Sequence, residues 1–495
     1  MREVVRAYRS AHEREIVSEL AAFVAIPNVA SDSVGIGRSA DALVQMLERR
    51  GLRPQRLESG VGGPPAVYAE WRVPGARRTV VFYAHYDGQP VVASQWQDGP
   101  WTPVLRDISG GFPGRVVALD SPTPFNPEWR LYARSASDDK GSIVGILTAI
   151  DALRAAHRVP SVNVKLFFEG EEEAGSPHLR EMLTRNAPLL AADAWLLCDG
   201  PIHQSRRMQV AFGVRGAMTM ELTTYGPNRP LHSGHYGNWA PNPAVALIHL
   251  LASMRDLEGH VLIPGFADDV VPIGATEQAA ARDASGSDDS LERSLALGRT
   301  EGAPRPLSEQ LLRPALNITG LRAGGVGAEL VNAIPSVAQA AADFRLVPRQ
   351  SPARIRDVVE AHIRAHGFFI VHDTPDSTTL TSHPNVIEVR WSDGYAGART
   401  PLDEPFAQTT VATLRSAFPD MVLIPAFGGS LPIAPISDVL NVPFVIVPIA
   451  NHDNNQHAAN ENLRLKNMWD GIEAYAVLLT GLDWPAHRHE PAAAR

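Results

Sequence analysis

The chain has 495 residues, a net charge of −9, 44% hydrophobic residues and 20% charged residues. This length exceeds the usual range of one domain, so we expect two. The negative charge argues against a nucleic-acid partner, and no apolar run approaches the roughly 18 residues that suggest a membrane span.

The first residues and the cysteine content suggest a compartment. The N-terminal segment mixes charges through a helical pattern and lacks the apolar core of a secretory signal. Cys198 is the only cysteine, so no intramolecular disulfide can form. We therefore expect a cytoplasmic protein that acts without a membrane. Cys198 itself ends an apolar run, where a lone cysteine is typically a small core residue rather than a ligand.

Apolar strand-like runs alternate with helical patterns along the first part of the chain. The runs at 78–87, 162–173 and 193–200 each end in polar residues, and a fourth lies at 442–453. A helical pattern with one apolar face covers 141–156. This alternation predicts an α/β architecture.

The pattern changes near residue 213. The segments 214–226 and 336–348 alternate apolar and polar residues, as in strands with one solvated face. Between them, Asn242 is a candidate N-cap and Pro243 a candidate first residue of a helix. We therefore expect an α+β domain at 213–396, inserted into a first domain made of 1–212 and 397–495.

Acidic residues and histidines follow the strand-like runs, at the strand ends where α/β sheets bind ligands. Taken singly, each group has a simpler interpretation as a hydrogen-bonded pair, a helix-capping turn or a solvated face. Their recurrence at five element ends favours a metal site, and carboxylates with imidazoles suit Zn, Mn or Co. Calcium is disfavoured because histidine is a poor ligand for hard cations. The groups are His85 with Asp87, Asp138, Glu171 to Glu173, Asp199, and His457.

Several stretches together resemble the dinuclear-zinc aminoacylase/carboxypeptidase family M20, which includes carnosine dipeptidases. They run in family order from about residue 80 to 462: "YAHYDGQP", "ARSASDDKGS", "FEGEEEAGS", "LLCDG", "LHSGHYGN", "NAIPSVAQAAADFRLVP", "FGGSLPIA" and "HAANE". The resemblance implies a mixed-sheet zinc exopeptidase domain whose inserted domain is a lid. It also implies a homodimer formed through that lid.

The resemblance also implies the metal ligands. His85 and Asp199 would hold one zinc ion, Glu173 and His457 the second, and Asp138 would bridge the two. In the family the peptide bond between Asp138 and Asp139 is cis. Mn²⁺ or Co²⁺ could replace Zn²⁺.

Other residues receive roles by the same resemblance. Asp87 would orient His85, Glu172 would be the general base, and Glu171 would only need to find solvent. His232 would stabilise the oxyanion, often from the neighbouring subunit. Four residues would hold the substrate tail: Arg345, Asn332, Gly429 beside Gly428, and Ser430. Asn332 stands where carnosinase-like members have threonine.

Two hydrolase activities fit this pattern. The first is an exopeptidase that cleaves dipeptides or short peptides with a free C-terminal carboxylate. The second is an N-acyl or N-carbamoyl amino acid amidohydrolase, which would use the same site. A non-catalytic relative is disfavoured because Glu172 and all five implied ligands are present.

One segment departs from the family. Residues 106–128 make the link before Asp138 about twenty residues longer than usual. The segment either rims the pocket and shapes substrate choice or forms a surface hairpin without a role.

Overall fold

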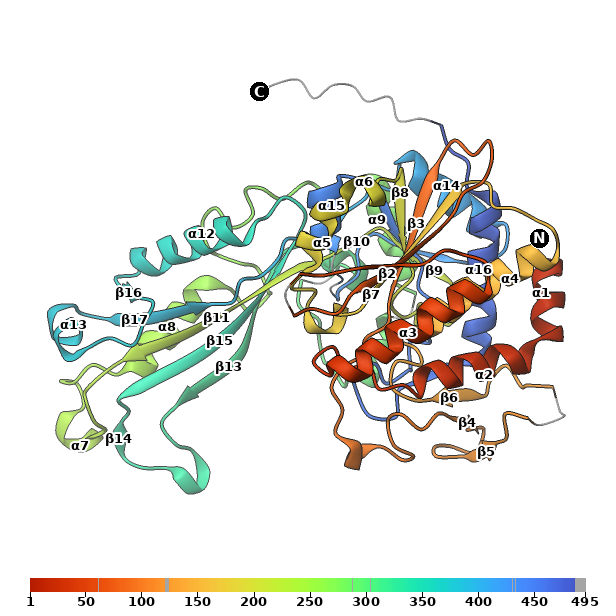
Figure 1. The fold of residues 1–495 in the computed structure, drawn as a ribbon. Helices are drawn as coiled ribbons and strands as arrows, with labels where there is room; N and C mark the ends of the chain where they lie inside the picture. The colour runs from red at the N-terminus through yellow and green to blue at the C-terminus, as the bar shows by residue number, and fades with distance from the viewer. Residues whose placement is uncertain are drawn as a thin grey trace. The chain divides into compact units, whose positions relative to one another are not determined.

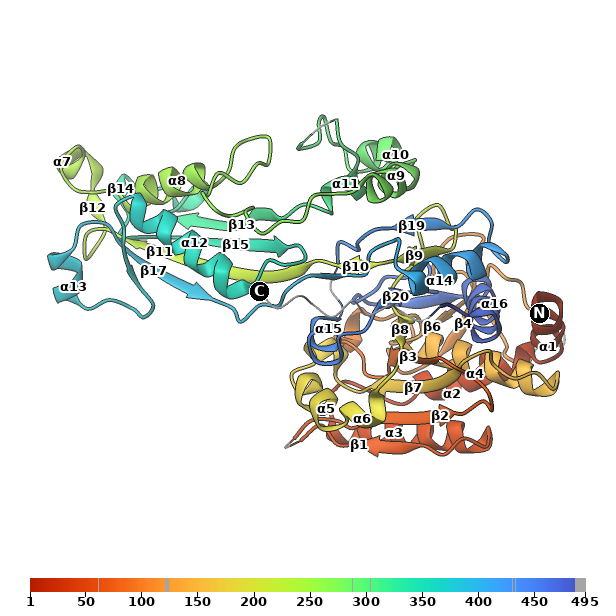
Figure 2. The ribbon, with the colours of Figure 1, turned by 90° about the horizontal axis from the view of Figure 1, so that it is seen from above.

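The protein is described by a computed structural model, which describes residues 1–60, 62–120, 124–286, 288–302, 304–429, 431 and 433–485. The chain divides into two compact units (Figures 1 and 2). Unit 1 comprises Met1–Gly213, Thr400–Pro425 and Leu431–Arg495, and unit 2 comprises Val214–Arg399 and Ala426–Ser430.

Unit 1 is built on an eight-stranded mixed sheet in the order β1-β2-β7-β3-β8-β20-β9-β19. In the middle of this sheet β7, β3, β8 and β20 run parallel to one another. The side chains of β3 from Val80 to Ala84 are fully buried, as expected of a parallel strand covered on both faces. The strands are β1 (Gln55–Leu57), β2 (Ala66–Trp71), β3 (Thr79–His85), β7 (Asn163–Glu169), β8 (Ala194–Leu197), β9 (Gln209–Ala211), β19 (Val422–Ile424) and β20 (Phe444–Ile446).

Helices pack on this sheet and on one another. The pairing of α4 (Lys140–Ala155) with α16 (Leu465–Gly481) is extensive, and both helices are buried along most of their length. Figure 1 shows the two lying together near α1 (Arg2–Ala11). The other helices of unit 1 are α2 (Glu13–Val24), α3 (Ser33–Arg49), α5 (Leu179–Arg185), α6 (Ala187–Leu190), α14 (Pro405–Arg415) and α15 (Ile433–Leu440), with 3₁₀ turns η1 (Ala93–Gln95) and η2 (Glu172–Ala174).

A second sheet of unit 1 contains the long link before Asp138. Its order is β21-β6-β4-β5, with β4 (Val104–Asp107), β5 (Arg115–Val117), β6 (Arg130–Tyr132) and β21 (Asn462–Arg464). The segment 106–128 thus begins in a hairpin of β4 and β5, and β5 is the edge strand. Residues 121–123 of this segment lie outside the described residues.

Unit 2 has a five-stranded sheet in the order β13-β15-β11-β17-β16, all antiparallel except the pair of β16 and β17. The strands are β11 (Gly216–Tyr225), β13 (Ala315–Ala323), β15 (Val337–Leu346), β16 (Phe369–Val371) and β17 (Val386–Trp391). Two short ribbons pair β10 (Gly213–Val214) with β18 (Ala398–Arg399), and β12 (Leu231–His232) with β14 (Ala333–Ile334).

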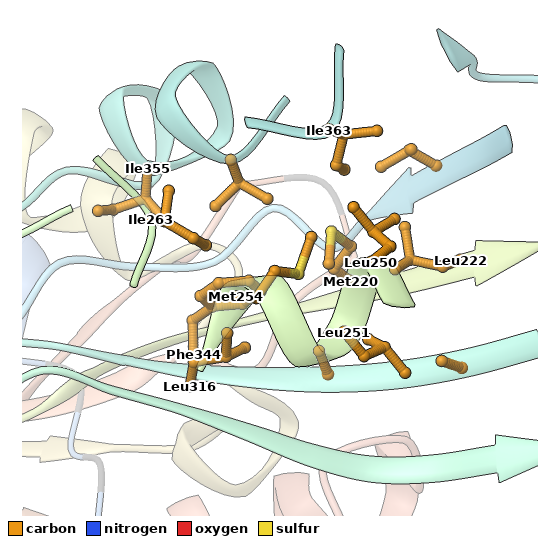
Figure 3. Close-up of a cluster of buried hydrophobic side chains, with 14 of the residues drawn as sticks. Met220, Leu222, Leu250, Leu251, Met254, Ile263, Leu316, Phe344, Ile355 and Ile363 are labelled. Carbon is orange, nitrogen blue, oxygen red and sulfur yellow. The ribbon is translucent and has the colours of Figure 1, made fainter. Parts of the chain in front are cut away.

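One face of this sheet carries the core of unit 2. Alternate residues of β11 and β15 point to that face and meet α8 (Pro243–Met254) and α12 (Pro352–Ala365). Figure 3 shows Phe344 of β15, Leu250 of α8 and Ile355 of α12 in this cluster. Asn242 caps α8 by accepting from the backbone N–H of Ala244. The remaining helices are α7 (Ser233–Tyr236), α9 (Ala275–Ala284), α10 (Asp288–Ser294), α11 (Leu307–Gln310), α13 (Ser377–Ser382) and η3 (Gly327–Glu329).

The predicted α/β class is confirmed, with a large mixed sheet in unit 1 and an α+β arrangement in unit 2. Among the helices that the structure describes, none is both long and apolar enough to cross a membrane.

Candidate metal centre

The polar residues predicted at strand ends meet at one edge of the large sheet. His85 is the last residue of β3, Glu172 and Glu173 follow β7, and Asp199 follows β8. These three strands are parallel neighbours, so their carboxyl ends lie at the same edge. Asp138 precedes α4, and its peptide bond to Asp139 is cis, as the family resemblance implies.

Two groups of side chains gather there, each able to hold a metal ion. In the first, His85 Nε2 lies 3.0 Å from Asp138 Oδ1 and 3.7 Å from Asp199 Oδ2. In the second, His457 Nε2 lies 3.2 Å from Asp138 Oδ2 and 3.3 Å from Glu173 Oε2. Asp138 belongs to both groups and offers one carboxylate oxygen to each. All five predicted ligands are therefore close together within unit 1.

The charges of these groups fit bound cations. Burial, then neighbouring carboxylates such as Asp138, raise the pKa of Glu173 to about 8 and that of Asp199 to about 7. One carboxylate oxygen of Glu173 is buried without a hydrogen-bond partner among the described residues. Three carboxylates with two imidazoles, and no thiolate, form a donor set that suits Zn²⁺, Mn²⁺ or Co²⁺. A divalent cation would favour the ionised form of these carboxyl groups, which burial and mutual repulsion disfavour.

Asp87 links the histidine of the first group to the glutamate turn. Its carboxylate lies 3.2 Å from His85 Nδ1, so it orients the ring whose Nε2 faces Asp138. The same carboxylate accepts from the backbone N–H groups of Glu172 at 3.1 Å and Glu173 at 3.0 Å. Asp87 is fully buried, so one side chain positions both a candidate ligand and the turn η2.

Glu172 lies in η2 directly before the candidate ligand Glu173. Burial raises the pKa of the Glu172 carboxyl well above its usual range, and although His85 opposes this, Asp199 and Glu173 add to it. A carboxyl group whose pKa is raised in this way can act as a general base and then as a general acid.

The expectation that Glu171 faces solvent is wrong. The side chain is 3% exposed, and its carboxylate accepts from the His178 backbone N–H at 2.9 Å and contacts His178 Nδ1 at 2.9 Å. His178 is only seven residues away, so this contact closes the loop after β7. The three adjacent glutamates therefore separate into a loop-closing group, a titratable group and a candidate ligand.

Sequence reasoning missed the residue that supports Asp138. Glu461 is fully buried, and its carboxylate accepts from the backbone N–H groups of Ser135, Ser137 and Asp138, each at 3.0 Å. Arg134 donates to it at 2.7 Å. Glu461 follows His457 closely in "HAANE", so an acidic residue beside a candidate ligand was the available signal.

Two glutamines complete the surroundings of the second group. Gln456 donates to Asp138 Oδ2 at 2.8 Å, and Gln89 donates to Glu173 Oε2 at 2.7 Å. Neutral amide donors hold these carboxylates in place without adding a competing positive charge. Sequence reasoning singled out neither glutamine.

The remaining predicted residues belong to unit 2. His232 lies in β12, is exposed, and its Nδ1 accepts from the backbone N–H of Gly234 at 3.0 Å. Asn332 lies just before β14, and its backbone carbonyl accepts from Ser233 at 2.9 Å. Arg345 in β15 donates through Nε to Asp343 at 2.8 Å. Gly429 is described next to Gly428, whereas Ser430 lies outside the described residues.

A two-group cation site at the carboxyl edge of a mixed α/β sheet is typical of metal-dependent hydrolases. The chain belongs to peptidase family M20/M25/M40, whose family model matches residues 81–481. It is thus an enzyme, a metal-dependent hydrolase of this family.

Individual relatives match nearly the whole chain. The Beta-Ala-His dipeptidase of Mus musculus is 27% identical over 98% of this chain and 96% of the relative. The Cys-Gly metallodipeptidase DUG1 of Candida albicans is 27% identical over 93% of both chains. Among solved structures, the M20 family metallo-carboxypeptidase Sso-CP2 of Sulfolobus solfataricus has a TM-score of 0.73 at 26% identity and covers 94% of this chain and 98% of that one.

Proposed function

We propose that the protein is a dinuclear-zinc dipeptidase that hydrolyses the amide bond of dipeptides with a free C-terminal carboxylate. The observation that carries the proposal is the pair of cation sites sharing Asp138, with Glu172 beside them. The names of the relatives support a dipeptide substrate, because two of them are dipeptidases that match this chain almost end to end.

His85 and Asp199 would hold one zinc ion, Glu173 and His457 the other, with Asp138 between them. When bound, the two ions supply Lewis acidity and lower the pKa of a water molecule toward neutrality. Mn²⁺ or Co²⁺ would suit the same oxygen and nitrogen donors.

The side chains of the protein would carry the proton transfers. A carboxylate oxygen of Glu172 takes a proton from the attacking water as its oxygen bonds to the amide carbon. The same carboxyl then gives this proton to the amide nitrogen as the C–N bond breaks. His232, from a partner subunit, would donate to the carbonyl oxygen while negative charge develops on it.

Residues of unit 2 would hold the substrate carboxylate. Asp343 engages only the Nε of Arg345, and no partner for its two terminal nitrogens is found in the described part of the chain. Those nitrogens can bind a carboxylate with two parallel hydrogen bonds. Asn332, Gly429 and Ser430 would add polar contacts to the same end of the substrate.

The assembly and compartment belong to the same proposal. Residues 213–396 would act as a lid and dimerisation domain, between the catalytic segments 1–212 and 397–495. We place the enzyme in the cytoplasm because its one cysteine, Cys198, is buried and unpaired. Light scattering on the purified protein tests the dimer, and a monomeric mass would contradict it.

A substrate panel tests the activity. The purified chain is loaded with Zn²⁺, Mn²⁺ or Co²⁺ and assayed on β-Ala-His, Cys-Gly, Ala-Ala, N-acetyl-alanine and N-carbamoyl-alanine. We expect the highest kcat/KM on a dipeptide, abolition by a chelator, and poor cleavage of the matching dipeptide amide. Faster cleavage of the acetyl or carbamoyl compound would instead identify an amidohydrolase.

A further inference from the structure

A cavity of about 770 Å³ lies within unit 2, beside the edge strand β13. Much of its wall is apolar, formed by Phe266, Val270, Val271, Ile273, Leu311 and Leu312. A space of this size, with an apolar wall and a few polar groups, suits a small organic ligand or part of one. The polar groups on its wall show which kind of ligand would fit.

Arg215 is a buried cation on the wall of this cavity. Arg215 directly precedes β11 in the chain and lines the cavity, and it is only 8% exposed. One terminal nitrogen donates to the backbone carbonyl of Arg313 at 3.0 Å, whereas its Nε has no partner among the described residues. Within the described part of the chain no carboxylate lies within ion-pair distance of Arg215. A buried guanidinium without a counter-charge is costly, and a bound anion would compensate it.

The guanidinium keeps its charge. Burial, followed by the nearby Arg345, lowers the pKa of Arg215 to about 10, while Asp343 opposes this. Arg215 is therefore protonated at neutral pH despite its burial. The cavity thus contains a permanent positive charge.

The other charged residues of the cavity leave a further positive excess. Glu301 forms an ion pair with Arg255 at 2.6 Å, and Glu258 one with Arg299 at 3.1 Å. Arg255 and Arg299 do not line the cavity, and they neutralise these two carboxylates, which are therefore not counter-charges for Arg215.

Two further arginines of the wall share one carboxylate. Glu309 lies 3.5 Å from Arg305 and 3.3 Å from Arg313. One negative charge thus faces two guanidinium groups. The cavity therefore favours an anion over a neutral or cationic ligand.

The cavity adjoins the residues proposed to hold the substrate carboxylate. Asn317 lies on its wall and donates to Asp343 at 3.4 Å, and Asp343 is the partner of Arg345. Leu311, also on the wall, comes within 3.2 Å of where a side chain would begin at Gly428. The cavity is thus next to both the arginine and the glycine loop of the proposed tail-binding site.

We propose that this cavity is a carboxylate-binding site with Arg215 as its cation, and that it receives the side chain of an acidic C-terminal residue of the substrate. The assignment of this site to the substrate side chain rests on the proposed dipeptidase function, because Arg345 would then hold the main-chain carboxylate of the same residue. The enzyme would accordingly favour dipeptides ending in Glu or Asp over dipeptides ending in Gln or Asn.

The first arm of the test compares Ala-Glu with Ala-Gln on the metal-loaded full chain. We expect a kcat/KM ratio of about ten or more in favour of Ala-Glu, because a site built for a charged hydrogen bond discriminates strongly against a neutral analogue. Arg215→Met should bring the ratio close to one, and Arg215→Lys should restore part of it. The matched control Arg322→Met replaces an exposed arginine of β13 and should keep the wild-type ratio.

The second arm measures glutarate binding to the full chain by calorimetry, with circular dichroism confirming that each variant is folded. We expect binding in the wild type and in Arg322→Met, and its loss in Arg215→Met. Arg215-dependent glutarate binding without a preference for Ala-Glu would support the site but overturn its assignment to the substrate side chain, because a free small carboxylate would then be the ligand. No glutarate binding and equal rates on both dipeptides would overturn the proposal. If no dipeptide is cleaved, the dipeptidase function fails, and the calorimetry alone decides on the site.

Discussion

At the residue scale, the three consecutive glutamates show how position decides the role of identical side chains. Glu171 contacts His178 and closes a loop, whereas Glu173 faces His457 in the second cation group. Glu172 lies between them, with its backbone N–H held by Asp87. The same functional group thus serves as a structural acceptor, a candidate base and a candidate ligand.

The role of Glu172 gives the first prediction. Glu172→Gln should keep both metal ions but lower kcat on the best dipeptide by about 10²- to 10⁴-fold, because an amide cannot accept the proton of the attacking water. Steady-state kinetics together with metal analysis by mass spectrometry would measure both effects. Glu171→Gln is the matched control and should retain most of the activity, since an amide oxygen can still accept from the His178 backbone. Equal kcat values in the wild type and Glu172→Gln would exclude Glu172 as the base.

At the element scale, the loop before α4 depends on a carboxylate that arrives from the other end of the chain. Glu461 precedes β21, which pairs with β6, and β6 leads into the loop that contains Asp138. The strand pairing therefore places Glu461 beneath three backbone N–H groups of that loop. Only a buried acceptor with several lone pairs can satisfy these donors together.

Glu461 gives the second prediction. Glu461→Ala should lower the free energy of unfolding of the metal-free protein by about 3–5 kcal/mol, because it leaves Arg134 buried without its partner. Urea denaturation followed by circular dichroism would measure the loss. Asp438→Ala serves as the comparison, because it breaks an exposed ion pair with Arg180 and should cost at most about 1 kcal/mol. Similar losses in the two variants would contradict the supporting role of Glu461.

At the scale of the whole molecule, each unit has its own sheet and its own buried cluster. The cluster of unit 2 is formed by one sheet face with α8 and α12, and Phe344 lies within it (Figure 3). The ring of Phe344 contacts those of Phe266 and Trp391. An independent core of this kind is what allows a domain to fold by itself.

The third prediction follows from that core. Residues 214–399, expressed alone, should fold cooperatively. Phe344→Ala in this fragment should cost about 3–5 kcal/mol, because it removes a large side chain from a closely packed core. Circular dichroism and urea titration would measure both properties. A fragment without a cooperative transition would show that unit 2 needs unit 1 in order to fold.

The sequence predicted the α/β class and a cluster of acidic residues and histidines at strand ends. It could do so because the apolar runs mark the strands, and because the carboxyl ends of parallel strands necessarily share one edge of a sheet. The resemblance to family M20 then paired the ligands, and the side chains of all five lie together in unit 1. Local pattern and chain order suffice for inferences of this kind.

Only the tertiary structure decided which residues support the site and where charge is left uncompensated. Glu461 and Arg134 are 327 residues apart, and neither has a local pattern that predicts their contact. Likewise, Arg215 looks like an ordinary arginine before a strand, and its burial without a carboxylate partner among the described residues is what distinguishes it. Burial and the pairing of charges depend on segments distant in the chain coming together, so they become visible only once the chain is folded.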